Sequence, residues 1–427
     1  MTGQEEEGYI VECDLEYPDG LHYDHASFPL APESVKITSS ILSPFATGKY
    51  FLLREKVKLL KVFFLSDCHE ILNPTKKNYS ATKLTATFQK RKKYVTHYAN
   101  LALYIRLGLK LTRVRRVLSF RQTNFLKIYI DHCTMLRKKS KTDFGKTLWK
   151  LFANAVFGKF IESSRDYLDI KVCLDKNRCK KLITNPNFSN LKIISEEIVL
   201  VFSKKPYALL NKPYAVGFTI LEKAKHFMYQ QYYDVIKPNL GNCEVLMSDT
   251  DSFLIAIHTD AETDNLDKIK HIIDFSNYPK DNIKYNTKNE NKLGFFKDEM
   301  KGSKITEYSG VRAKAYVIEV LNELTRIKHE QIKLKGITAA ARKKMGKKHF
   351  IGCVKSIKKF RVTQHHIRSK NHLLQTIAVN KIALTSFDDK RFLFNCSVHS
   401  VPYGSKIIRE NKLMKCPFCK MFNPLQK

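Results

Sequence analysis

Two acidic side chains at the centre of a short apolar segment constrain the fold more than any other feature of the sequence. Asp249 and Asp251 are separated by Thr250, with Val245-Leu246 before them and 254–257, all apolar, after them. Apolar runs of this length, bounded by turn residues, are typical of two strands joined by a tight turn. We therefore expect a β-hairpin over 244–257 that holds both carboxylates at its tip.

The spacing of these two carboxylates indicates a metal site. Asp249 and Asp251 would repel each other unless a divalent cation that both can reach removes the repulsion. Mg²⁺ takes one or two carboxylates together with waters and substrate phosphates, which is the chemistry of phosphoryl transfer. An isolated Asp-x-Asp is more often a solvated acidic turn than a metal site. The apolar residues on both sides favour a metal site here, but do not by themselves exclude the solvated turn.

A second feature is an apolar segment, 143–161, whose periodicity predicts a helix. Within it Lys146, Lys150, Asn154 and Gly158 follow at four-residue steps and form one polar stripe on one face. The stripe offers a cation for a triphosphate, an amide, and a gap where a base can approach the backbone. A solvated outer face is the alternative, but it does not explain a glycine that costs about 1 kcal/mol against alanine inside a helix.

The charge of the chain indicates a polyanionic partner. There are 75 Lys+Arg against 41 Asp+Glu, a net charge of +34, although residues 1–35 carry acids and no Lys or Arg. Nucleic acid is the first candidate for such an excess, and an anionic membrane surface is the second. Basic runs at 90–93 and 342–348 fit phosphate contact, although such runs are commonly just solvated faces. A basic surface is also expected around His365, His366 and His372.

Membrane insertion and secretion are not expected. No apolar run reaches the roughly 18 to 20 residues that span a bilayer, and the first seven residues are acidic where a signal peptide would be basic and then apolar. The ten cysteines are scattered, as in proteins with reduced thiols. We expect an intracellular protein, with no preference among nucleus, cytoplasm and organelle.

The rest of the chain shows mixed α and β patterns. We expect a helix over 94–109, a strand with one basic face over 111–120, short strands over 162–212, and a helix over 215–233.

Three motifs in a fixed order resemble those of family B DNA polymerases. The family's K-x-x-x-N-S-x-Y-G is matched by 150–158, where Ala155 replaces the Ser and Phe157 the Tyr; D-T-D-S is matched by 249–252, and K-x-Y by 314–316. The ordered set is more specific than any one motif. The similarity runs from about residue 8 to about 405 and is strongest to the protein-primed viral and organellar branch, including polymerases of Maverick/Polinton-type transposons. Shorter blocks that also fit are 8–18, 28–33, 293–299 and 387–391.

The resemblance implies a two-Mg²⁺ phosphoryl-transfer site. Asp251 would ligate metal, and Asp249 would support or coordinate it. Lys150 would pair with the triphosphate of the incoming nucleotide, helped by Lys138 or Arg137.

The resemblance also implies contacts with DNA. Asn154 and Gly158 would shape the pocket for the nascent base pair, and Lys314 and Tyr316 would position the primer strand. The implied partners are a DNA primer-template, deoxynucleoside triphosphates and a terminal-protein primer.

The implied fold is α+β, in the right-hand arrangement of an antiparallel-sheet palm, helical fingers and a C-terminal thumb. The domains expected on this basis are a partial palm (1–35), a terminal-protein-region-like insert (36–110), fingers (111–161), a second, β-rich insert (162–212), palm with the D-T-D-S hairpin (213–310), and thumb with a basic C-terminal region (311–427).

One family motif is missing. The D-x-x-(S or N)-L-Y motif, whose Asp is the metal-binding partner of Asp251, does not occur before Lys150; the segment 14–18 (D-L-E-Y-P) is too short and lacks the Ser/Asn-Leu pair. We therefore expect an N-terminally truncated polymerase, without the exonuclease domain or the first palm motif. Such a chain would bind primer-template DNA and extend it feebly or not at all; robust synthesis would point to Asp14 or Glu16 as a substitute carboxylate.

Two other classes of protein are alternatives. A reverse transcriptase would carry adjacent carboxylates, which the spacing of Asp249 and Asp251 excludes. A non-catalytic nucleic-acid-binding remnant of a mobile-element polymerase shares every feature except activity, and the missing motif favours it.

A zinc site near the C-terminus is the last hypothesis. Cys396 and His399 followed by Cys416 and Cys419 have the spacing of four tetrahedral ligands. Against zinc, His399 belongs to a stretch, 399–404, that resembles a family block without a metal. The sequence therefore argues for Mg²⁺ as the cofactor and against zinc.

Overall fold

The computed structural model describes residues 6–44, 46, 79–258, 265–290, 292–322, 326–356, 359–370, 373–394, 396–410 and 416–420. The expectations for His372 and for most of 45–78 fall outside these ranges. The chain divides into a first unit (1–8, 119–224 and 365–379) and a second unit (9–118, 225–364 and 380–427), and both combine helices with strands.

The N-terminal sheet of the second unit has β1 (Glu7–Glu16) between β4 (Arg91–His97) and β5 (Lys110–Arg121). Alternate residues of β1 are buried: Val11, Cys13 and Leu15. This buried face joins a core with helix α3 (Tyr98–Arg106) and the chain around residues 229–278. The predicted strand over 111–120 is confirmed as β5.

The opposite face of β1 explains where the N-terminal acids go. Three of its carboxylates pair with basic residues: two on β5, and one, Lys90, just before β4. The pairs are Glu12–Arg116 (3.4 Å), Asp14–Arg115 (2.6 Å) and Glu16–Lys90 (3.2 Å).

The helix expected over 94–109 is wrong in its first turn. Residues 94–97 belong to β4, where Tyr94 lies opposite Cys13 of β1, and the helix begins only at Tyr98. Pairing with β1 therefore overrides the local helical spacing. The His97 side chain then caps α3 by accepting a hydrogen bond from the backbone of Ala99.

The basic run 90–93 is also not a uniform phosphate-contacting face. The Arg91 side chain is fully buried, and it donates hydrogen bonds to the carbonyl oxygens of Ala31 (3.2 Å), Leu30 (3.5 Å), Gln89 and Thr87. Arg91 thus holds β4 against the chain that leads into β2, because its five donors need buried acceptors.

The helix expected over 215–233 is confirmed in outline. Helix α7 (Tyr214–Gln230) continues through a π-helical turn, η3 (Gln231–Ile236), into α8 (Lys237–Leu240). The Tyr229 and Tyr233 hydroxyls donate hydrogen bonds to the carbonyl oxygens of Pro29 (2.8 Å) and Phe28 (2.6 Å). These two tyrosines, one at the end of α7 and one in the π-helical turn, therefore anchor residues 28–29 to the core.

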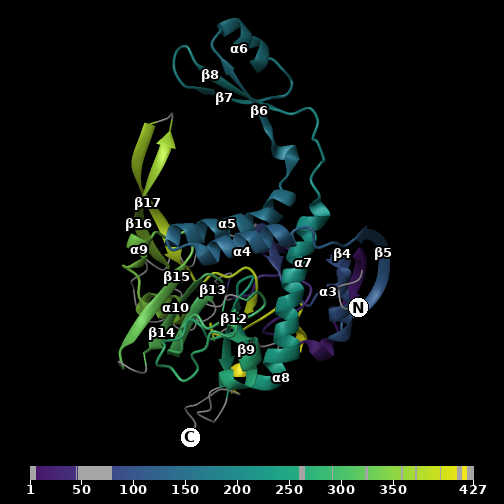
Figure 1. Ribbon diagram of the computed structural model, residues 1–427, viewed down its shortest axis with the longest axis vertical. Helices are drawn as coiled ribbons and strands as arrows, with labels where there is room; N and C mark the ends of the chain where they lie inside the picture. The colour runs from purple at the N-terminus through teal and green to yellow at the C-terminus, as the bar shows by residue number, and fades with distance from the viewer. Residues whose placement is uncertain are drawn as a thin grey trace, which may run out of the picture. The chain divides into compact units, whose positions relative to one another are not determined.

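A second sheet contains β13 (Lys304–Arg312), β14 (Ala315–Leu321) and β15 (Lys328–Leu334), all antiparallel. Helix α10 (Lys347–Ser356) packs on it (Figure 1), with Phe350 and Cys353 fully buried beside Val317. Helix α9 (Ala339–Arg342) precedes α10, and a long hairpin of β16 (Phe360–Lys370) and β17 (Leu373–Leu384) follows it.

A third core joins segments far apart in the sequence. The strands β2 (Glu33–Thr38) and β3 (Ser80–Thr85), the pair β18 (Phe392–Leu393) and β19 (Ser400–Val401), and α11 (Lys406–Glu410) supply its elements. Hydrogen bonds reinforce the junction: Arg391 to the Ala26 oxygen (3.0 Å), Lys406 N to His22 Nδ1 (2.9 Å), and Arg409 to Asp19 (2.6 Å).

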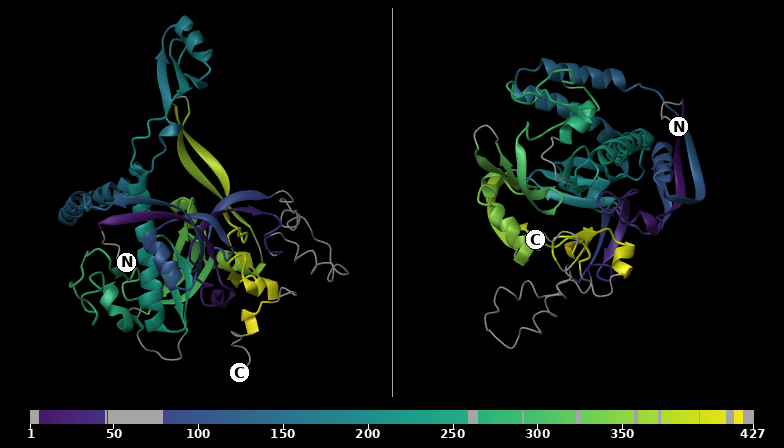
Figure 2. Two further views of the ribbon diagram at one scale, coloured as in Figure 1. Left: turned by 90° about the vertical axis from the view of Figure 1, so that its right-hand side faces the viewer. Right: turned by 90° about the horizontal axis from the view of Figure 1, so that it is seen from below.

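The first unit contains helices α4 (Lys127–Lys139) and α5 (Asp143–Phe160), which pack together, and a small sheet. The sheet has the order β6 (Leu168–Cys173), β8 (Val199–Lys204), β7 (Phe188–Ile193), and helix α6 (Lys176–Ile183) lies against it (Figures 1 and 2). The short strands expected over 162–212 are thereby confirmed. Within the described ranges, no helix is both long and apolar enough to cross a membrane.

Short elements complete the described chain. They are η1 (Asp19–Leu21), η2 (Ser164–Asp166), η4 (Asn265–Ile272), η5 (Phe418–Lys420) and the parallel pair β11 (Ile273–Asp274) and β12 (Phe296–Lys297).

Candidate functional site

The acidic pair lies at the tip of a hairpin in the second unit, as the sequence predicts. Strands β9 (Cys243–Ser248) and β10 (Phe253–Ile257) are antiparallel, and Ser248 lies opposite Phe253. The tip is closed by hydrogen bonds from Asp249 N to Ser252 O (3.0 Å) and from Asp251 N to Asp249 O (2.6 Å).

The backbone at this tip is strained. Thr250 has a φ of +59°, which is rare for a β-branched residue and costs about 1 kcal/mol or more. The turn places Asp251 on the surface and leaves the Asp249 side chain 35% exposed. The Asp251 carboxylate is therefore open to an approaching cation, and the Asp249 carboxylate is partly exposed.

A second hairpin tip meets the first. Strands β13 and β14 are joined by Ala313 and Lys314 between the paired residues Arg312 and Ala315, and Lys314 also has a positive φ, +62°. The Lys314 Nζ lies 2.9 Å from Oδ1 of Asp249. The structure thus brings together the D-T-D-S and K-x-Y segments, which are distant in sequence.

Tyr316 shares this environment. Burial, followed by the charges of Asp249 and Glu299, raises the pKa of the Tyr316 hydroxyl. Its ring lies 6.0 Å from that of Tyr308. Glu299 is an acid that sequence reasoning did not assign to the site, although the block 293–299 already resembled the family and carried the signal.

Gly310 lets the two tyrosines come together. It is paired with Tyr316 across the β13–β14 ladder, and a Cβ on it would clash with the Tyr308 hydroxyl oxygen. The Tyr308 ring therefore occupies the space that a side chain at 310 would need.

The donor set at the tip suits one Mg²⁺ shared with substrate phosphates, because Mg²⁺ commonly uses one or two protein carboxylates. In the described part of the chain, no third acid, His or Cys joins Asp249 and Asp251 in a metal-binding group. Asp14 and Glu16, considered as substitutes, are instead paired with Arg115 and Lys90. Hydrogen bonds from Arg115 and from the Lys93 N–H lower the pKa of Asp14 to about 2.

The polar stripe lies along α5 in the first unit, and its helix is confirmed. Thr142 caps the helix by accepting a hydrogen bond from Gly145 N. Lys146, Lys150 and Asn154 are exposed on one face. A Cβ at Gly158, on the same face, would meet nothing within 4 Å, so packing does not explain this glycine.

Helix α4 carries the two other candidates for phosphate contact. Arg137 and Lys138 are exposed in its last turn, and among the described residues neither forms an ion pair. Cys133 is the residue of α4 that packing buries.

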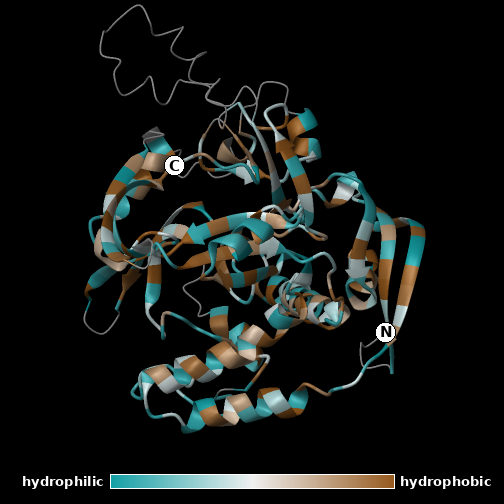
Figure 3. Cartoon of the chain, turned by 90° about the horizontal axis from the view of Figure 1, so that it is seen from above, coloured by the Kyte–Doolittle hydropathy of each residue, from teal (hydrophilic) through white to brown (hydrophobic). Residues whose placement is uncertain are grey.

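Hydrophobic residues recur along both helices of this pair (Figure 3). Several of their large apolar side chains are exposed, including Ile128 (81% exposed), Phe144 (76%) and Leu151 (63%). This distribution differs from that of a helix with one buried and one solvated face.

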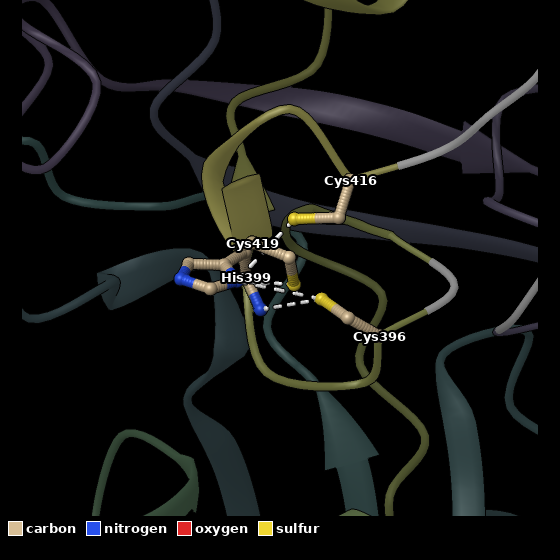
Figure 4. Close-up of side chains that lie close together, drawn as sticks. All are labelled: Cys396, His399, Cys416 and Cys419. Carbon is tan, nitrogen blue, oxygen red and sulfur yellow. Dashed lines mark hydrogen bonds between the residues drawn. The ribbon is translucent and has the colours of Figure 1, made fainter. Parts of the chain in front are cut away.

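The four candidate zinc ligands come together at the C-terminal end of the second unit (Figure 4). One ligand atom from each of Cys396, His399, Cys416 and Cys419 lies within 4.8 Å of all the others. The sequence disfavours zinc only through the resemblance of 399–404 to a block without metal, and this geometry reopens the hypothesis.

Comparison with protein-family models and with curated proteins finds no match. Among solved structures, the chain is similar to phi29 DNA polymerase complexed with primer-template DNA and incoming nucleotide substrates, with 17% identity and a TM-score of 0.47, over 88% of this chain and 51% of that one. It is also similar to phi29 DNA polymerase complexed with single-stranded DNA, with 16% identity and a TM-score of 0.40, over 81% of this chain and 45% of that one. The chain thus spans about half the length of the solved polymerase to which it is similar.

Proposed function

We propose that this chain is a DNA-directed DNA polymerase, a nucleotidyltransferase of the protein-primed family B type with the right-hand fold. The observation that carries the proposal is the meeting of two hairpin tips, where Lys314 contacts Asp249 at 2.9 Å. This contact joins the D-T-D-S and K-x-Y motifs. If the acidic pair were only a solvated turn, the two motifs would have no reason to meet.

In this proposal, the acidic tip is the metal-binding part of the site. Asp251 is the principal ligand, because it is exposed, and Asp249 is the second once Lys314 releases it. A bound Mg²⁺ would activate the primer 3′-hydroxyl and neutralise the leaving pyrophosphate.

The remaining residues bind and orient the substrates. Lys314 and Tyr316 would hold the primer strand; Lys150, with Lys138 or Arg137, would pair with the triphosphate. Asn154 and the open face at Gly158 would bound the nascent base pair. Holding the reactants in place is most of the catalysis in phosphoryl transfer.

The finer assignments that we propose rest on the motifs: fingers at 111–161, thumb with a basic C-terminal region at 311–427, priming by a terminal protein, and an origin in Maverick/Polinton-type elements. We also propose that this 427-residue polypeptide extends primers weakly. Two carboxylates hold metal less firmly than three, and a misplaced metal lowers the rate steeply.

The test is primer extension on a labelled primer-template with all four deoxynucleoside triphosphates and Mg²⁺. We expect slow, template-dependent addition that Asp251→Asn abolishes while leaving DNA affinity within about twofold. Asp169→Asn, which changes an acid on β6, is the matched control and should leave the rate unchanged.

A non-catalytic DNA-binding protein is the second candidate, favoured by the lack of a third metal ligand beside Asp249 and Asp251 among the described residues. Tight primer-template binding without extension in either Mg²⁺ or Mn²⁺ would establish it. Absence of both DNA binding and extension would contradict both functions.

A further inference from the structure

We propose that Cys396, His399, Cys416 and Cys419 bind one Zn²⁺ ion as a closed structural site. The ion would fasten residues 416–420 to the turn between β18 and β19. The proposal is independent of the polymerase function, because none of these residues belongs to the hairpin tips or to the α5 stripe.

Three sulfur atoms converge on one ring nitrogen (Figure 4). Nδ1 of His399 lies 3.4 Å from Sγ of Cys396, 3.3 Å from Sγ of Cys416 and 3.7 Å from Sγ of Cys419. With Zn–S of about 2.3 Å and Zn–N of about 2.0 Å, a tetrahedral ion sets each of these separations near ~3.5 Å. The side chains are therefore already spaced as they would be around the ion.

The sulfur atoms also accept backbone hydrogen bonds. The backbone N–H groups of Val398 and His399 donate to Sγ of Cys396, the latter at 3.3 Å. The backbone N–H of Cys419 donates to Sγ of Cys416 in the same way. Backbone N–H groups directed at cysteine sulfur atoms are the kind of surrounding hydrogen bonds that orient ligands around a metal ion.

The backbone around Cys396 is shaped for this turn. Ser397 has a φ of +65°, and hydrogen bonds join Ser397 N to Phe394 O and Phe394 N to His399 O, both at 3.0 Å. Residues held in such uncommon backbone conformations cluster at functional and ligand-binding sites.

The surroundings favour a structural over a catalytic ion. Four protein ligands leave no open coordination position for a substrate. The His399 ring stacks on Phe418 with centroids 5.5 Å apart, and Phe418 packs near Phe394 of the third core. The ion would thus lie between an ordered turn and an apolar core.

The experiment measures the metal content of the full-length protein purified under reducing conditions without chelator. We expect one zinc per chain by elemental analysis. Replacement by Co²⁺ should give sulfur-to-cobalt charge-transfer bands and the visible bands of a tetrahedral site. Cys416→Ser and His399→Ala should lose the bound zinc, whereas Cys179→Ser, a control on α6, should retain it.

If the ligand variants do not fold, the cobalt spectrum of the unmodified protein alone still shows whether thiolates bind the metal. A zinc content well below one per chain together with no thiolate charge-transfer band would overturn the proposal. A disulfide among Cys396, Cys416 and Cys419 in protein kept under reducing conditions would also overturn it.

Discussion

At the β9–β10 tip, Asp249 already has a cationic partner, the ammonium group of Lys314 at 2.9 Å. The contact is only partly buried, so the pair contributes little to stability, about 0–1 kcal/mol. Its consequence is functional: an ammonium group held at this oxygen competes with any divalent cation that approaches it.

Replacing Lys314 therefore tests the competition. We expect Lys314→Met to tighten Mg²⁺ binding to the DNA-free protein severalfold, because Asp249 is released. Isothermal titration with Mg²⁺ alone measures it. Lys328→Met, which removes a lysine paired with Glu319 on another part of the sheet, should leave Mg²⁺ affinity unchanged; unchanged affinity in Lys314→Met would show that Asp249 does not bind the metal.

Replacing Gly158 should have opposite effects on the stability of the fold and on nucleotide incorporation. Because a Cβ there meets nothing within 4 Å, Gly158→Ala should raise the free energy of unfolding by about 0.5–1 kcal/mol through helix propensity. If the open face receives a base pair, the same change should lower nucleotide incorporation at least tenfold. Urea unfolding and single-nucleotide extension measure the two effects, and a variant that is stabilised but fully active would exclude Gly158 from the pocket.

The Asp14–Arg115 pair should show in the acid stability of the fold. The pKa of Asp14 is lowered to about 2 in the folded protein and is close to 3.9 in an unfolded chain. A depressed pKa stabilises the folded state above about pH 4, and that contribution is lost as the pH falls toward 2. The difference in stability between the wild type and Asp14→Asn should shrink as the pH falls from 6 to 2. Urea midpoints measured across this range check it, and a difference that does not change with pH would contradict it.

At the scale of elements, the sequence predicted best where periodicity and packing agree. Helix α5 and the β9–β10 hairpin lie where their apolar patterns place them. The sequence places the start of α3 too early, because β1, the partner that makes Tyr94–His97 a strand, is some eighty residues away. Local spacing carries no information about that pairing.

The candidate site follows the same division. The motifs make Asp249, Lys314 and Tyr316 candidates for the site, but the contact between the two hairpin tips cannot be derived from spacing. The convergence of the four cysteine and histidine side chains was likewise outside what the sequence could settle, because it depends on how 416–420 returns to the β18–β19 turn.

Strand β4 gives a prediction of its own. Arg91 anchors this strand through four carbonyl oxygens, three of them in buried hydrogen bonds, so Arg91→Met should lower the free energy of unfolding by about 3 kcal/mol or more. Lys92→Ala, at the next, exposed position, should change it by less than about 0.5 kcal/mol. Denaturant unfolding of both variants checks this, and equal effects would show that Arg91 is not the anchor.

At the scale of the whole molecule, the net charge of +34 is not spread evenly along the chain. The acids of β1 are neutralised inside a sheet, whereas lysines such as Lys343, Lys344 and Lys348 remain exposed. The positive charge that can contact a polyanion therefore lies outside β1, on exposed lysines of this kind.

This distribution predicts a strong salt dependence of DNA binding. The logarithm of the binding constant should fall linearly with the logarithm of salt concentration, and Lys343→Ala with Lys344→Ala should reduce the slope by about 1 for each phosphate that is no longer neutralised. Fluorescence anisotropy over a salt series measures it. Lys347→Ala is the control, because Lys347 is paired with Glu307 and Glu319; a slope unchanged in the double variant would remove these lysines from the DNA-binding surface.

The core that joins Ile37 and Leu42 to Phe394 and Ile407 has a consequence for biosynthesis. The chain around residue 40 cannot complete its packing until more than 350 further residues have left the ribosome. During that interval the apolar side chains around residue 40 remain exposed to solvent. Contacts between residues so far apart in sequence also form slowly. We expect nascent chains stalled before residue 390 to be captured by chaperones through the β2–β3 segment, and chains released after residue 410 to escape them.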